Sequence, residues 1–161
     1  MCWYSKSARS ASWRDEVKAA SGSIRGFSFS PDSASVAFGT AGTSGASDAP
    51  SDLYSYSLED EVRNRITRDR KSLNPLWGPA GILHDRMRVR GGDAPSYNVF
   101  TIKPDGGSLR RITTLRIPGL MSGLVPLEQS ADGKRLLANF VGQDTQVAFR
   151  VNLMNGKAKA L

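Results

Sequence analysis

Three arginines near the middle of the chain, Arg86, Arg88 and Arg90, alternate with Met87 and Val89. Side chains two positions apart in a β-strand point to the same face of the sheet, so this spacing places three guanidinium groups side by side. Such a row suits an acidic protein, a polyanionic glycan or nucleic acid. We therefore predict a candidate partner-binding basic face at Arg86, Arg88 and Arg90, with a role in binding rather than in folding.

Other basic residues are concentrated at 63–71 and at 110–116. The simpler interpretation is that Arg63, Arg65, Arg110 and Arg111 lie on outer strands and face water. We favour this interpretation over one in which all the basic residues form a single binding face. No aromatic residues are interleaved among the arginines for base stacking, which argues against single-stranded nucleic acid. We expect the partner to be another protein or the remaining blades of a longer chain, and nucleic acid is not expected.

The residues of common catalytic and metal sites are missing from the sequence. A serine hydrolase of the α/β type needs G-x-S-x-G with acid and histidine partners, and the nearest sequence, at 119–123, has the wrong spacing. His84 is the single histidine and Cys2 the single cysteine, too few for a standard zinc site. We expect His84 to be packed at an apolar strand. The sequence thus predicts no catalytic, cofactor-binding or metal residues, and a protein that is not an enzyme.

Acidic and glycine-rich turns have a structural explanation. Asp32, Asp105 and Asp132 stand in separate turns and do not form a D-x-D-x-D-G calcium loop. We expect each carboxylate to accept hydrogen bonds from its own turn backbone. The glycine pairs at 91–92 and 106–107 lack the Lys-Ser/Thr and the helix of a phosphate-binding loop.

The composition is that of a globular domain. The chain has 161 residues, with 39% hydrophobic and 23% charged residues and a formal net charge of +7. It contains no apolar run of about 18 residues, so we expect no membrane span. The first residues lack the apolar stretch of a secretory signal, and the compartment stays open.

A repeated order of turns organises the chain from residue 23. Ser30-Pro31-Asp32-Ser33 separates two apolar strands, at 24–30 and 34–38, and related turns stand at 78–81 and 130–133. Each is followed by two more strands, which we expect at 52–57 and 62–67, 97–102 and 109–113, and 146–151 and 157–161. Four short strands at a period of about 50 residues are typical of propeller blades. We predict an all-β, partial β-propeller of about three four-stranded antiparallel blades.

The expected organisation is blade 1 at 23–69, blade 2 at 70–115 and blade 3 at 116–161. Residues 1–22 are interpreted as an N-terminal tail or the remnant of a preceding blade. Propellers close with about four to eight blades. We therefore expect either a fragment of a longer propeller, which we favour, or a homodimer that completes a six-bladed ring.

At its turns and strand ends the chain resembles the TolB-like β-propeller repeats, a family that is related to the WD-type repeats and that includes many bacterial proteins. The resemblance rests on three elements of the first unit (Phe29 to Asp32, Asp52-Leu53-Tyr54 and Arg65-Ile66-Thr67) and on Trp77, Pro104-Asp105-Gly106 and Arg111-Ile112-Thr113 in the second. It implies a non-catalytic protein-binding or scaffolding module, in the periplasm or another extracytoplasmic compartment, or otherwise in the cytoplasm. The alternative is the gating propeller of a prolyl-oligopeptidase-like serine peptidase whose catalytic domain is absent from this chain.

Overall fold

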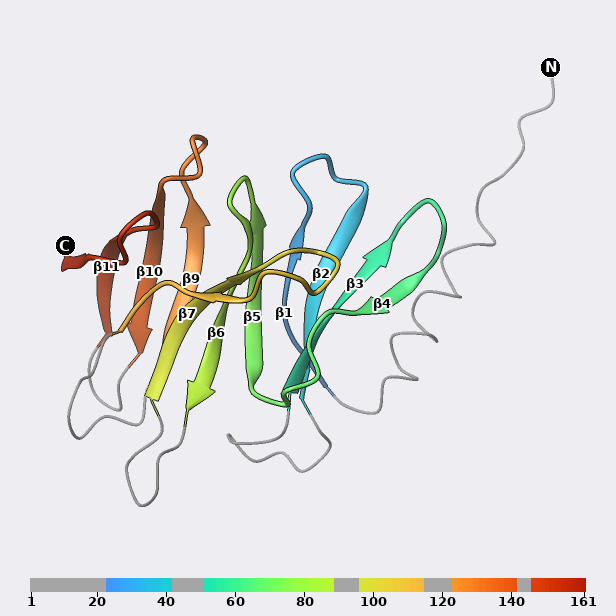
Figure 1. Cartoon of the computed structure of the whole chain (residues 1–161), viewed down its shortest axis with the longest axis horizontal. Helices are drawn as coiled ribbons and strands as arrows, with labels where there is room; N and C mark the ends of the chain where they lie inside the picture. The colour runs from blue at the N-terminus through green and yellow to red at the C-terminus, as the bar shows by residue number, and fades with distance from the viewer. Residues whose placement is uncertain (1–22, 42–50, 89–95, 115–122, 142–145) are drawn as a thin grey trace.

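The computed structural model describes residues 23–41, 51–88, 96–114, 123–141 and 146–161, and these form three sheets of four antiparallel strands without a helix (Figure 1). Blade 1 consists of β1 (Ser23–Phe29), β2 (Ser35–Ala41), β3 (Ser51–Ser57) and β4 (Arg63–Arg65). Blade 2 consists of β5 (Ser72–Gly78), β6 (Gly81–Arg88), β7 (Ser96–Ile102) and β8 (Arg110–Arg111). Blade 3 consists of β9 (Gly123–Gln129), β10 (Arg135–Val141), β11 (Gln146–Asn152) and β12 (Ala158–Ala160). The strands of each sheet follow chain order, so the predicted fold class is confirmed.

The recurring turn has the same hydrogen bonds in blades 1 and 3. In blade 1, Asp32 Oδ1 accepts a bond from the Ala34 amide at 3.0 Å, and the Ser30 hydroxyl donates to the same oxygen. Asp132 Oδ1 does the same with the Lys134 amide at 3.0 Å, and the Gly107 amide donates to Asp105 Oδ1 at 2.7 Å. The hydrogen bond from Ser30 lowers the pKa of Asp32, and the one from Ser130 lowers the pKa of Asp132. The predicted turn role of all three aspartates is confirmed.

The first strands of blades 1 and 2 meet at two β-bulges. Gly26 is the extra residue of β1, with φ 69°, and Asn74 lies in the bulge of β5, with φ 47°. A Cβ on Gly26 would lie 3.1 Å from the Asn74 Cα. Glycine at this position therefore serves both the left-handed backbone and the close approach of the two strands.

The three blades lie side by side (Figure 1). Two apolar clusters join them. Ala37, Leu53 and Ile66 of blade 1 pack with Ile82 and Ile102 of blade 2. A larger cluster joins blades 2 and 3 and contains Leu83, Val99, Ile112, Leu124, Leu136, Ala138, Phe140, Val151 and Leu153. Because side chains alternate along a strand, neighbouring residues of β6 serve different clusters. Both faces of blade 2 are therefore buried between blades.

Blades 2 and 3 each also form hydrogen bonds to the blade before them. The Trp77 amide donates to Ser28 Oγ at 2.9 Å, and the Trp77 ring packs on the first cluster. At the corresponding position of blade 3, Gln129 accepts from the Ala80 amide at 3.1 Å and donates to the Gly81 carbonyl at 3.2 Å. Residues 1–22, interpreted from the sequence as an N-terminal tail or the remnant of a preceding blade, lie outside the described residues.

Candidate functional site

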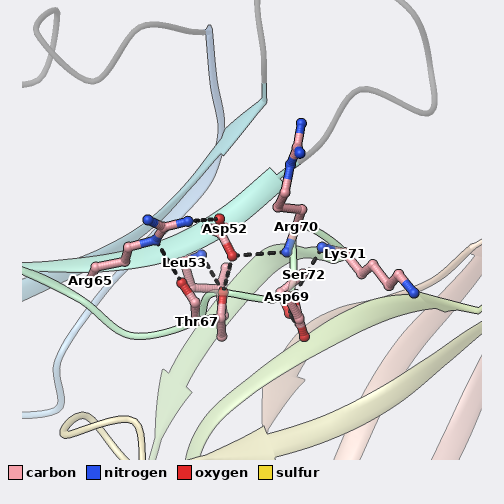
Figure 2. Close-up of polar contacts among 8 residues, drawn as sticks. All are labelled: Asp52, Leu53, Arg65, Thr67, Asp69, Arg70, Lys71 and Ser72. Carbon is pink, nitrogen blue, oxygen red and sulfur yellow. Dashed lines mark hydrogen bonds and ion pairs between the residues drawn. The ribbon is translucent and has the colours of Figure 1, made fainter.

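A polar network joins the closing strand of blade 1 to the segment that leads into blade 2 (Figure 2). Asp52, at the start of β3, accepts hydrogen bonds from Arg65 Nη2 at 2.6 Å, from the Thr67 hydroxyl at 3.0 Å and from the Arg70 amide at 3.1 Å. The Thr67 hydroxyl in turn accepts from the Leu53 amide at 2.9 Å. The Asp-Leu and Arg-Ile-Thr residues of the repeat are therefore partners in one structural network.

Blade 2 repeats this network with one change of charge. The Thr113 hydroxyl accepts from the Val99 amide at 3.0 Å and donates to Asn98 Oδ1 at 3.0 Å, and Arg111 Nε donates to the Thr113 carbonyl at 2.6 Å. Asn98 thus occupies the place that Asp52 has in blade 1. The geometry is kept while a carboxylate is replaced by an amide.

Arg86, the first residue of the predicted basic face, is held by two contacts. Its Nε lies 2.6 Å from Asp69 Oδ2, in an ion pair too bent to count as a hydrogen bond, and its guanidinium carbon lies 5.2 Å from the centre of the Phe100 ring. Its side chain is 28% exposed. Sequence reasoning missed Asp69 because the pair joins two segments that only the fold brings together. Arg88 ends β6, Arg90 lies outside the described residues, and their role in binding stays a prediction.

The basic residues near the repeat ends lie on the outer strands of their sheets. Arg63 and Arg65 belong to the exposed strand β4, and Arg110 and Arg111 to β8. Arg63 lies 5.6 Å from the centre of the Tyr54 ring. Their predicted position is confirmed, and Arg65 also serves the network around Asp52.

His84 is fully buried on the face of β6 that points to blade 1, as the packed interpretation predicted. Its ring lies 6.1 Å from the Phe100 ring, and neither ring nitrogen has a hydrogen-bond partner of good geometry, the Ile82 backbone being only a polar neighbour. Burial lowers the pKa of His84 to about 4, with Asp69 opposing and Arg86 adding to the shift. The imidazole is therefore neutral at physiological pH.

Asp85, the next residue, is buried on the opposite face of β6, on the side of blade 3. Its carboxyl group accepts from Asn74 Nδ2 at 3.2 Å, and its Oδ1 has no hydrogen-bond partner. Burial raises the pKa of Asp85 to about 7, against the lowering effect of Asn74. Sequence reasoning missed this residue, although an aspartate directly after an apolar strand is a signal that could have been found.

Among the described residues, no group of three His, Cys, Asp or Glu side chains is arranged to hold a metal ion. The same part of the chain has no helix long and apolar enough to cross a membrane. The single described histidine, His84, has no exposed surface from which to contact a substrate.

The two faces at the ends of the row of blades expose apolar side chains, whereas the faces between blades bury them. Phe27 and Phe29, which share the outer face of blade 1, are 68% and 52% exposed. Leu161 is 74% exposed, whereas Ile66 and Ile112, its counterparts in blades 1 and 2, are 5% and 7% exposed. The three positions are equivalent because their amides donate to carbonyls at the same place in each blade. These carbonyls belong to Ala148 for Leu161, to Leu53 for Ile66 and to Val99 for Ile112. A position that is buried between blades is therefore open on blade 3.

Neither a protein-family model nor a curated protein sequence matches this chain. Among solved structures, TolB from Acinetobacter baumannii matches with a TM-score of 0.58 at 20% identity, over 85% of this chain and 32% of that protein. A protein assigned as TolB from Agrobacterium tumefaciens matches with a TM-score of 0.62 at 18% identity, over 86% and 48%. A prolyl endopeptidase structure matches with a TM-score of 0.54 at 14% identity, over 87% and 22%.

This chain therefore spans less than half the length of each of these proteins. At such identities the likeness is one of fold. The resemblance expected from the repeat residues is confirmed at that level, and the three blades have the architecture of a TolB-like β-propeller.

Proposed function

We propose that this chain is a non-catalytic binding module whose open blade faces bind a further blade of the same kind. The observation that carries the proposal is the exposure of Phe29, at 52%, at the position where Trp77 of blade 2 packs between blades. An apolar sheet face of this type is stabilised by burial against another sheet.

The opposite end offers a matching surface. Trp77 packs on the cluster of Ala37, Leu53 and Ile66, and the corresponding residues on the outer face of blade 3 are Leu137, Ala148 and Leu161 by strand register. A hollow of about 230 Å³ lies there, lined in part by Leu137, Arg150 and Leu161. An aromatic residue from an incoming blade, such as Phe29 of a second copy, fits this position.

Light scattering on the full chain tests this proposal. We expect the wild type to have twice the single-chain mass of 17.4 kDa, as two copies meet end to end, and Phe29→Ser to return it to the single-chain mass. Met154→Ser is the matched control, because Met154 is equally apolar and 74% exposed but lies in the turn between β11 and β12. A wild type that stays at the single-chain mass, or a Met154→Ser variant that dissociates as much, contradicts the proposal.

The second candidate function is the gating propeller of a prolyl-oligopeptidase-like peptidase, supported by the structural match to a prolyl endopeptidase. In that case the open faces bind other blades of the same polypeptide, and catalysis belongs to a separate domain. The encoding gene distinguishes the two: an α/β-hydrolase region in the same reading frame supports the peptidase, and its absence contradicts it.

A further inference from the structure

The turn between the third and fourth strands of blades 2 and 3 lies very close to the preceding blade. In blade 2 a Cβ on Gly106 would lie 2.8 Å from the Ile66 carbonyl oxygen of blade 1. In blade 3 a Cβ on Gly156 would overlap the Ile112 carbonyl oxygen of blade 2. Side-chain carbons do not approach backbone oxygens this closely. Both turns therefore need glycine for the contact between blades, as well as for their positive φ angles of 84° and 70°.

Blade 1 has a glutamate at the same position of its turn. The hydrogen bond that closes this turn ends at the Val62 carbonyl, and the one in blade 3 ends at the Lys157 carbonyl, each five residues after its donor. Glu61 and Gly156 are the residues just before these carbonyls, with φ angles of 57° and 70°. Because the two backbones turn in the same way, the Cβ of Glu61 occupies the place that is empty at Gly156.

This glutamate bears on the contact between two copies of the chain. The counterpart of Ile66 and Ile112 on blade 3 is Leu161, as their equivalent amide hydrogen bonds show. If blade 1 of a second copy docked on blade 3 as blade 3 docks on blade 2, the Glu61 Cβ would overlap the Leu161 carbonyl oxygen. The turn of an incoming blade 1 must therefore stay farther from blade 3 than the glycine turns stay from the blades before them.

We propose that Glu61 weakens the contact between copies, so that the open face of blade 3 binds a second copy less tightly than it would bind a blade with glycine at this position. The inference rests on the proposed end-to-end contact. Phe29, on the first strand of its sheet, enters the hollow beside Leu161. Glu61 lies between β3 and β4, at the other side of the sheet, and holds that side of the blade away. The contact then buries less apolar surface than a joint inside the chain.

Sedimentation equilibrium of the full chain over a dilution series tests the inference. Glu61→Gly removes the overlap and should lower the dissociation constant of the dimer at least about tenfold, as expected when an overpacked contact is relieved. Glu61→Gln loses the charge but keeps the Cβ, so it should associate like the wild type. Ser108→Gly is the matched control, because it also replaces a residue with positive φ, of 55°, but lies in a turn of blade 2. It should leave the dissociation constant unchanged.

The outcomes separate this inference from the proposed function. Adding Phe29→Ser to Glu61→Gly should return the chain to the single-chain mass, since the tighter contact uses the same face of blade 1. If wild type and Glu61→Gly form dimers of equal affinity, or if Glu61→Gln tightens the dimer as much, the inference is wrong and the proposed function stands. If only Glu61→Gly associates, the inference holds and the proposed function fails for the wild type. If neither associates, both are wrong. Far-ultraviolet circular dichroism checks that each variant is folded.

Discussion

Two adjacent buried residues of β6, His84 and Asp85, make the stability of this protein depend on pH in opposite directions. Burial lowers the pKa of His84 from 6.5 to about 4 and raises the pKa of Asp85 from 3.8 to about 7. The folded state therefore holds the Asp85 proton more tightly than the unfolded state does, and the reverse is true of His84. Each difference in pKa is also a difference in the free energy of unfolding.

For Asp85 the raised pKa gives a contribution to stability that is complete below pH 3.8 and is lost as the pH rises to about 7. One pKa unit corresponds to about 1.4 kcal/mol, so the total loss is about 4 kcal/mol. For His84 the lowered pKa gives a contribution that is complete above pH 6.5 and is lost as the pH falls to about 4. That loss is about 3 kcal/mol. Between pH 4 and 6.5 the two slopes cancel, and above 6.5 only the Asp85 slope remains.

The substitution His84→Phe separates the two effects. Blade 1 has Phe38 at this position, stacked on Tyr54 at 5.7 Å, so the fold accepts a phenyl ring there. Removing buried nitrogens that have no hydrogen-bond partner should stabilise the protein by about 1–3 kcal/mol at pH 8. Below pH 6.5 the advantage should grow, because the variant keeps only the slope of Asp85. Its stability should then fall by about 1.4 kcal/mol per unit from pH 4 to 7.

Urea unfolding followed by tryptophan fluorescence measures these profiles. The matched variant is Asp85→Asn, whose stability should rise from pH 4 to 6.5 and then stay level, because only His84 remains. Wild type should be nearly level over the same range. If all three proteins have parallel profiles, the two buried groups do not control the pH dependence and the reasoning is refuted.

Three further substitutions test the packing between blades by urea unfolding. Trp77→Ala should cost about 2–3 kcal/mol, below the range of about 3–5 for a fully buried aromatic, because the Trp77 ring is only partly buried; a loss under about 1 kcal/mol would contradict its place between the blades. Thr67→Val should cost about 2 kcal/mol, since Asp52 and the Leu53 amide each lose a buried hydrogen-bond partner; an unchanged midpoint would show that the network is not needed. Gly156→Ala should cost more than about 2 kcal/mol, because Gly156 has φ 70° and a Cβ there would overlap the Ile112 carbonyl oxygen, and an equally stable variant would mean that blades 2 and 3 do not touch at this turn.

The twelve strands could be predicted from the sequence because each repeat carries its own turn residues. Two hairpins are recognisable from their turn residues alone, Ser30 to Ser33 and Pro104-Asp105-Gly106. The observed strand β2 begins just after the first turn, and β7 ends just before the second. Local patterns do not report which blade faces which. The pair of Asp69 with Arg86 was missed for that reason. The change from Asp52 to Asn98 was open to prediction by comparing the repeats position by position.

The burial of His84 and Asp85 follows from the place of blade 2 in the row. A strand with one covered face places its polar residues on the other, but β6 has a cluster on each side, so neither residue reaches water. In blade 1 the same two positions hold Phe38 and Gly39, which have no charge to bury. Between pH 4 and about 7 the shifted pKa values leave His84 deprotonated and Asp85 protonated, so both are neutral. Blade 2 can therefore carry two ionisable residues in its interior without burying a charge. Above pH 7 Asp85 ionises, and only then does the fold bear the free-energy cost of a buried charge.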